Sequence, residues 1–126
     1  MNKNRTIIAL LIIFISVFYT GCQQQEHMRH IVIFKYKPTA THDQIEKVTA
    51  ALAELKNTIP GIVAFEHGIN DSPEQKNLGY THVYMFTFED AAARDEYLPH
   101  PKHKEFGQML EKLDILEDAF VIDYIP

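Results

Sequence analysis

Two segments of this chain carry large apolar side chains on both sides of an extended backbone, and this pattern most restricts the possible folds. Residues 29–36 are rich in β-branched and aromatic side chains and predict a strand. Its central side chains alternate between the two sides and are all apolar: Ile31, Val32, Ile33 and Phe34. Residues 80–88 predict a second strand of this kind. A sheet built from such strands needs cover on both faces.

Helix signals and turn residues predict the other elements. Thr41 and Gln44 form a capping box, and apolar residues at helical spacing follow until Pro60 ends the helix. The remaining predicted elements are, in order, strand 62–69, helix 89–98, helix 101–113 and strand 119–125. The order βαββααβ predicts an α+β fold of the ferredoxin-like kind, in which helices cover one face of a four-stranded antiparallel sheet.

That arrangement leaves the second face of the sheet without cover. At least two strands place large apolar groups on it, and such an area is rarely left in contact with water. The simplest cover is a second copy of the same sheet, packed by two-fold symmetry. We therefore predict a homodimer in which two sheets face each other as a dimeric α/β barrel.

The N-terminal residues predict a signal segment rather than part of the fold. Lys3 and Arg5 precede an apolar run over residues 7–18, which is shorter than the ~20 residues of a membrane-spanning helix. Cys22, the only cysteine, follows Gly21, which resembles a bacterial lipoprotein signal with an acylated cysteine. An uncleaved anchor is the alternative. The predicted organisation is a signal peptide over 1–22, a linker over 23–27 and a domain over 28–126.

The charge balance bears on partners and location. Lys3 and Arg5 are two of 12 basic residues, so the rest of the chain has 10 basic against 17 acidic residues. This balance argues against nucleic acid as a partner, because phosphate binding relies on clustered Lys and Arg. We expect a protein of the cell envelope, lipid-anchored through Cys22 to the outer or cytoplasmic membrane on its periplasmic or extracellular side.

Six short motifs then occur in the order of one family. They are RHIVIFK (29–35), IPG (59–61), GYTH (79–82), FTF (86–88), YLPHPKH (97–103) and VIDY (121–124). With them the chain resembles the stress-responsive α/β-barrel (Dabb) family over residues 28–125. The resemblance implies the same dimeric α/β barrel that the uncovered face indicates.

The resemblance also implies candidate site residues. Most members of the family have no assigned biochemical role, but one plant member is a polyketide cyclase. Its acid–base histidine matches His103, and its supporting tyrosine matches Tyr97. His30, His82 and His100 match other histidines of that enzyme. As catalysts, His103 would abstract a proton next to a carbonyl and Tyr97 would orient or protonate the substrate oxygen, without a metal or organic cofactor.

A structural role competes with this catalytic interpretation. Pro101 fits the first position of a helix, so His100 can cap that helix and His103 can bond a backbone carbonyl. We therefore favour a membrane-anchored dimer without established catalysis that binds a small apolar ligand in the barrel. The candidate ligand-pocket residues are His30, His82, Tyr84, Phe86 and His100.

Two alternatives remain open on the sequence. One is a cofactor-independent cyclase or lyase that uses His103 and Tyr97. The other is a metal-binding envelope protein, because imidazoles suit zinc, copper or nickel. That site would use the four histidines at positions 30, 82, 100 and 103, but their spacing fixes no geometry, and we assign no metal ligand. Asp123, near the end of the last strand, is expected to be a surface carboxylate.

Overall fold

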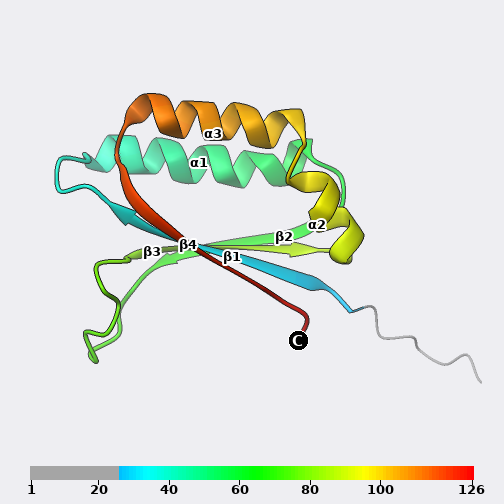
Figure 1. Ribbon diagram of the computed structural model, residues 1–126, viewed down its shortest axis with the longest axis horizontal. Helices are drawn as coiled ribbons and strands as arrows, with labels where there is room; N and C mark the ends of the chain where they lie inside the picture. The colour runs from blue at the N-terminus through cyan, green and yellow to red at the C-terminus, as the bar shows by residue number, and fades with distance from the viewer. Residues whose placement is uncertain (1–25) are drawn as a thin grey trace, which may run out of the picture.

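The structure is a computed structural model and describes residues 26–126, so the predicted signal segment and Cys22 lie outside the described residues. The elements are β1 (Met28–Tyr36), α1 (His42–Thr58), β2 (Ile62–Ile69), β3 (His82–Phe88), α2 (Ala91–Tyr97), α3 (Pro101–Leu113) and β4 (Leu116–Tyr124). Their order is the predicted βαββααβ (Figure 1). Between residues 26 and 126, no helix is both long enough and apolar enough to span a bilayer.

The four strands form one antiparallel sheet in the order β2-β3-β1-β4. The helices lie together on one face of this sheet (Figure 1). In the central strand β1, His30 lies opposite Phe86 of β3 and Asp123 of β4. The predicted ferredoxin-like fold is therefore confirmed, and the register brings residues about 90 positions apart into direct contact.

The capping box at the start of α1 forms as predicted. The Gln44 backbone N–H donates to Thr41 Oγ1 at 3.3 Å, and the Thr41 N–H donates to Gln44 Oε1 at 2.9 Å. The apolar stripe of α1 is buried against the sheet. After the helix, Gly61 turns the chain at φ +85°, and an added Cβ would lie 2.7 Å from the Ala93 Cβ. Glycine is required at this turn.

Three predicted boundaries were wrong by two or three residues. The third strand starts at His82 because the residues before it form a turn, in which the Tyr80 N–H donates to the Asn77 carbonyl at 2.8 Å. The helix predicted over 89–98 starts at Ala91, since Asp90 is its N-cap. The last strand starts at Leu116, which pairs with the end of β1.

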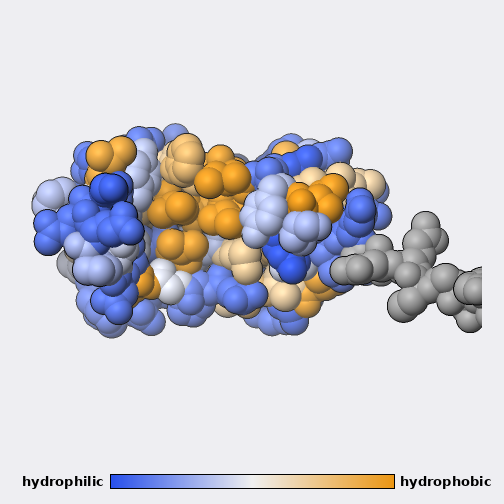
Figure 2. Space-filling view, turned by 90° about the horizontal axis from the view of Figure 1, so that it is seen from below, coloured by the Kyte–Doolittle hydropathy of each residue, from blue (hydrophilic) through white to orange (hydrophobic). Residues whose placement is uncertain are grey.

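The main core lies between the helices and the sheet, and the largest fully buried side chains in it are Tyr84, Tyr97, Phe86, Phe88 and Val48. The opposite face of the sheet, here called the open face, is apolar and uncovered (Figure 2). Cross-strand pairing places six apolar residues on it: Ile31, Ile33, Val83, Met85, Phe120 and Ile122. Phe120 is 51% exposed and Ile122 40%. The uncovered apolar face predicted from the strand pattern is therefore present.

Candidate functional site

The junction between α2 and α3 positions two of the predicted site residues. Pro101 is the first residue of α3, and His100 is its N-cap, with Nδ1 accepting from the Lys102 N–H at 3.1 Å. His100 therefore has the capping role that was considered as the structural alternative. His103 follows in the first turn of the helix, and its ring lies 4.3 Å from that of Tyr97.

The hydrogen bond of His103 determines its tautomer. His103 Nδ1 lies 3.0 Å from the Leu98 carbonyl oxygen. Since a carbonyl oxygen can only accept, Nδ1 carries the proton, and in the neutral ring the lone pair is on Nε2. The backbone contact thus holds the ring in place and leaves Nε2 to accept a proton from a ligand.

Tyr97 lies beside this imidazole and is 1% exposed. Burial raises the pKa of Tyr97, so its hydroxyl stays protonated and serves as a hydrogen-bond donor. Among residues 26–126, no fully buried side-chain oxygen or nitrogen lacks a hydrogen-bond partner. No hydrogen-bond partner of the Tyr97 hydroxyl is found in that part of the chain, so this hydroxyl is not completely buried.

A second histidine completes this end of the molecule. His30 is 5% exposed, and its ring centre lies 5.8 Å from that of Tyr97. Its Nδ1 lies 2.6 Å from Asp123 Oδ1, and the Arg94 guanidinium pairs with the other carboxylate oxygen. Because the carboxylate accepts, His30 Nδ1 donates and its neutral ring also has the lone pair on Nε2. We call His30, Tyr97 and His103 the histidine–tyrosine site.

Asp123 and Arg94 are the residues that sequence reasoning missed. Asp123 was expected to be a surface carboxylate, but it is an acceptor for the buried His30 and for Arg94. One signal was available, since alternation along β4 places Asp123 on the same side of the strand as Val121. Which face that side belongs to depends on the pairing of β4 with β1, and the sequence does not contain this register.

The five predicted pocket residues do not lie together. His82 pairs with Phe34, four residues along β1 from His30, which is ~13 Å at about 3.3 Å per residue. Tyr84 belongs to that distant end, where its hydroxyl lies 3.0 Å from the Tyr36 hydroxyl and 2.9 Å from Thr49 Oγ1. The expectation that these five residues line one pocket is therefore corrected, because His82 and Tyr84 lie at the other end of the sheet from His30. Phe86 packs 5.6 Å from Tyr97 and is part of the core beneath the site.

The histidines also do not form the four-ligand metal site considered from the sequence. Over the described part of the chain, no three His, Cys, Asp or Glu side chains are placed to hold a metal ion. His82 lies in a different setting from His30, because burial lowers the pKa of its imidazole and its ring packs edge-on 4.9 Å from Tyr36.

A hollow lies between α3 and β4. On α3, Gly107 and Glu111 line it, on the same side of the helix as His103. On β4, Val121 lies on the same side of the sheet as Asp123 and is 51% exposed, because the helices leave this edge strand uncovered. We call this feature the α3–β4 cleft.

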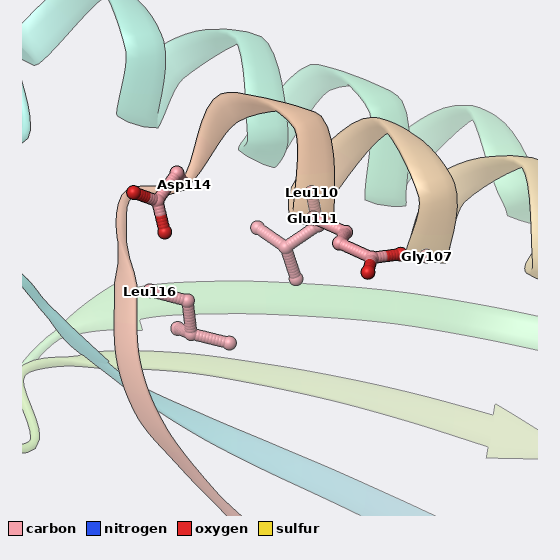
Figure 3. Close-up of a pocket in the computed structure, with 5 residues that line it drawn as sticks. All are labelled: Gly107, Leu110, Glu111, Asp114 and Leu116. Carbon is pink, nitrogen blue, oxygen red and sulfur yellow. The ribbon is translucent and has the colours of Figure 1, made fainter.

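The α3–β4 cleft is open to solvent and has a volume of about 330 Å³. Its lining residues are Gly107, Leu110, Glu111, Asp114 and Leu116. Figure 3 shows Leu110 on α3 and Leu116 at the start of β4 pointing toward each other across this hollow. The volume is in the range of small-molecule sites. The cleft therefore combines apolar and acidic lining residues.

Comparison with known families agrees with this architecture. The sequence profile of the Stress responsive A/B Barrel Domain family matches residues 28–126, and the chain belongs to this family. The predicted membership is confirmed.

Two curated plant proteins are similar to the chain over 99 residues, which is 79% of its length. The stress-response A/B barrel domain-containing protein HS1 of Arabidopsis thaliana is 35% identical, with 89% of its own length covered. Olivetolic acid cyclase of Cannabis sativa is 29% identical, with 96% covered.

Two solved structures share the fold. Hydroxynitrile lyase from Passiflora edulis has 30% identity and a TM-score of 0.72, with 81% of this chain and 94% of that chain covered. A dimeric ferredoxin-like protein of unknown function from Jannaschia sp. CCS1 has 32% identity and a TM-score of 0.66, with 78% and 97% covered. These relatives consist of little more than the matched segment, so a domain of this kind folds by itself.

Proposed function

We propose that this protein binds a small, largely apolar molecule in the α3–β4 cleft, with a carbonyl or hydroxyl group of that molecule at the histidine–tyrosine site. One observation carries the proposal. The ring of Tyr97, a buried hydrogen-bond donor, packs beside those of His30 and His103, and both imidazoles are held through Nδ1, so that in each neutral ring Nε2 is the acceptor. A donor beside two acceptors suits a single polar group on an otherwise apolar ligand.

The proposal is tested by native mass spectrometry of the protein extracted from its producing cell. We expect a small organic molecule to remain bound to the wild-type protein and to be lost from a Tyr97→Phe variant, which lacks only the hydroxyl. Lys104→Ala changes an exposed side chain of the same helix and should keep the bound molecule. Equal ligand content in all three proteins, or none in any, would contradict the proposal.

A cofactor-independent lyase or cyclase is the second candidate, favoured by the free Nε2 of His103. In this mechanism Nε2 takes a proton from the carbon next to a substrate carbonyl, and the Tyr97 hydroxyl donates to the oxygen where negative charge develops. A positioned acid–base group of this kind contributes ~10²–10⁴-fold in rate. Two relatives carry the names of a cyclase and a lyase, which supports acid–base chemistry on this scaffold.

Deuterium exchange tests this second candidate without knowledge of the substrate. The protein is incubated with 2-butanone in D₂O, and proton NMR follows loss of the signals next to the carbonyl. Catalysis predicts exchange above the buffer rate that disappears in His103→Ala. Exchange at the buffer rate for wild type at saturating ketone would leave binding as the function.

Homodimer formation through the open face is part of the proposal. The open face is continuous with a second hollow of about 470 Å³, which lies between the β2–β3 connection and Ile33, Val83 and Phe120. A similar protein of 32% identity is described as dimeric. Two copies packed face to face would remove both apolar surfaces from water, which is the main driving force for such assembly.

Lipid anchoring at Cys22 is also a proposal, and it rests on the sequence alone. Lys3, Arg5 and the apolar residues 7–18 precede the single cysteine, which is the order of a lipoprotein signal. Mass spectrometry of the mature N-terminus should find an acylated Cys22 in the membrane fraction. A Cys22→Ser variant of the full chain should not be acylated, and an unmodified Cys22 in the wild type would contradict the proposal.

A further inference from the structure

Leu78 is an unusual residue for its position in the β2–β3 connection, residues 70–81. Its backbone has φ +53°, in the left-handed region that glycine and asparagine tolerate better than leucine. The residue is also 81% exposed, so its apolar side chain lies almost entirely in water. Both features are unfavourable for a protomer by itself. A strained backbone that displays an apolar side chain indicates a contact outside the protomer's own core.

Hydrogen bonds fix the backbone on both sides of Leu78. Asn77 and Tyr80 close a turn around it, in which the Tyr80 N–H donates to the Asn77 carbonyl at 2.8 Å and Asn77 Nδ2 donates to the Tyr80 carbonyl at 2.9 Å. The Tyr80 hydroxyl then donates to Asp118 Oδ2 of β4 at 2.5 Å, which ties the connection to the edge of the sheet. Leu78 is therefore presented in one position, and little backbone freedom remains to be lost when a partner binds it.

Leu78 belongs to the same apolar surface as the open face. The β2–β3 connection leaves the sheet on the side opposite the helices (Figure 1). There Leu78 lines the hollow of about 470 Å³ together with Ile33, Val83 and Phe120 of the open face. The leucine and the open face are thus walls of one hollow. A second copy of the chain that covers the open face therefore meets the connection as well.

We infer that Leu78 is a contact residue for a second copy of this chain, and that the β2–β3 connection extends the dimer interface beyond the sheet. This inference rests on the homodimer in the proposed function. Burial of one leucine side chain raises an association constant by a factor of about 10–10². Two-fold symmetry brings the leucines of both copies into the interface, so together they contribute a factor of about 10²–10⁴.

Leu78→Asn tests the inference, because asparagine tolerates the left-handed backbone but lacks the apolar side chain. In sedimentation equilibrium of residues 26–126, the dimer dissociation constant should rise at least about 10²-fold. Ile69→Asn is the matched control. Ile69 ends β2 just before the connection and is 70% exposed, but it pairs with His82 and lies on the helix side of the sheet. Its substitution should change the dissociation constant by no more than about threefold.

The stability of the monomer separates this role from a structural one. If Leu78 supported the fold of its own protomer, Leu78→Asn would lower the melting temperature of a chain that cannot dimerise. The measurement uses the Phe120→Ala background at a concentration where it is monomeric. There the melting temperature should stay the same or rise, since asparagine relieves the strain of the left-handed backbone. A lower melting temperature would contradict the inference.

Isotope-filtered NMR on a mixture of labelled and unlabelled chains tests the contact without a substitution. The Leu78 methyl groups should show nuclear Overhauser effects to protons of the other copy, and the Ile69 methyl groups should show none. Absence of these signals for Leu78 in a dimeric wild type would overturn the inference and leave the homodimer standing, as would a Leu78→Asn variant that associates as tightly as Ile69→Asn. A monomeric wild type would show that both are wrong.

Discussion

Replacing Phe120 by alanine is the sharpest test of the proposed dimer. Phe120 lies on the open face and is 51% exposed, so about half of its ~200 Å² of surface is available to a partner. Burial of this ~100 Å² stabilises by roughly 2.5 kcal/mol at ~25 cal/mol per Å². Two-fold symmetry doubles the contribution to ~5 kcal/mol, less the small part that the alanine methyl retains. We expect the dimer dissociation constant to rise about 10³-fold.

Val121→Ala is a control from the neighbouring position of the same strand. Val121 is also 51% exposed, but it pairs with Val32 on the helix side of the sheet and should not enter the dimer interface. Its substitution should leave the dissociation constant within about threefold of the wild type, or roughly 0.6 kcal/mol.

Sedimentation equilibrium of residues 26–126 over a dilution series measures these dissociation constants, and circular dichroism checks that each variant is folded. Two results would refute the reasoning. One is a wild-type protein that is a compact monomer at micromolar concentration. The other is a Phe120→Ala variant that associates as tightly as the Val121→Ala control, which would show that the open face is not the contact surface.

Three further predictions concern stability. Thr41→Ala removes one half of the capping box and should lower the free energy of unfolding by about 1 kcal/mol in urea titrations. Asp123→Asn removes the charge that pairs with His30 and Arg94 and should lower the free energy of unfolding by about 1.5–3 kcal/mol in the same assay. The same substitution at a fully solvated carboxylate would leave the free energy of unfolding almost unchanged. Burial lowers the pKa of His82 in the folded protein below its unfolded value of about 6.5, so the unfolded state takes up the extra proton. The free energy of unfolding should therefore fall as the pH drops below about 6.5. This decrease should be smaller in His82→Gln. If the wild type and His82→Gln show the same dependence on pH, the explanation is wrong.

The histidine–tyrosine site shows how a modest set of contacts can prepare polar groups for a ligand. The Leu98 carbonyl and the Asp123 carboxylate each take an Nδ1 proton, which places both acceptor lone pairs on Nε2. Burial keeps the Tyr97 hydroxyl protonated, because it raises the pKa of that phenol. With both imidazoles neutral, the site therefore offers one donor and two acceptors.

Local signals in the sequence determined the order and nature of the elements. The Thr41 capping box, the Pro101 helix start and the apolar alternation of the first strand act over a few residues, and each appears in the structure as predicted. The uncovered apolar face was also predicted from the local pattern, because a strand with apolar side chains on both sides needs cover on both faces of its sheet.

Only the tertiary structure decided which polar residues meet. His30 and Asp123 are 93 residues apart, and their contact depends on the register of β1 against β4. A shift of this register by one residue would place the two side chains on opposite faces of the sheet. The same register separates His82 and Tyr84 from the site to which they were assigned. Local backbone preferences depend on short stretches of chain, whereas long-range contacts form only when the sheet and the helices pack together.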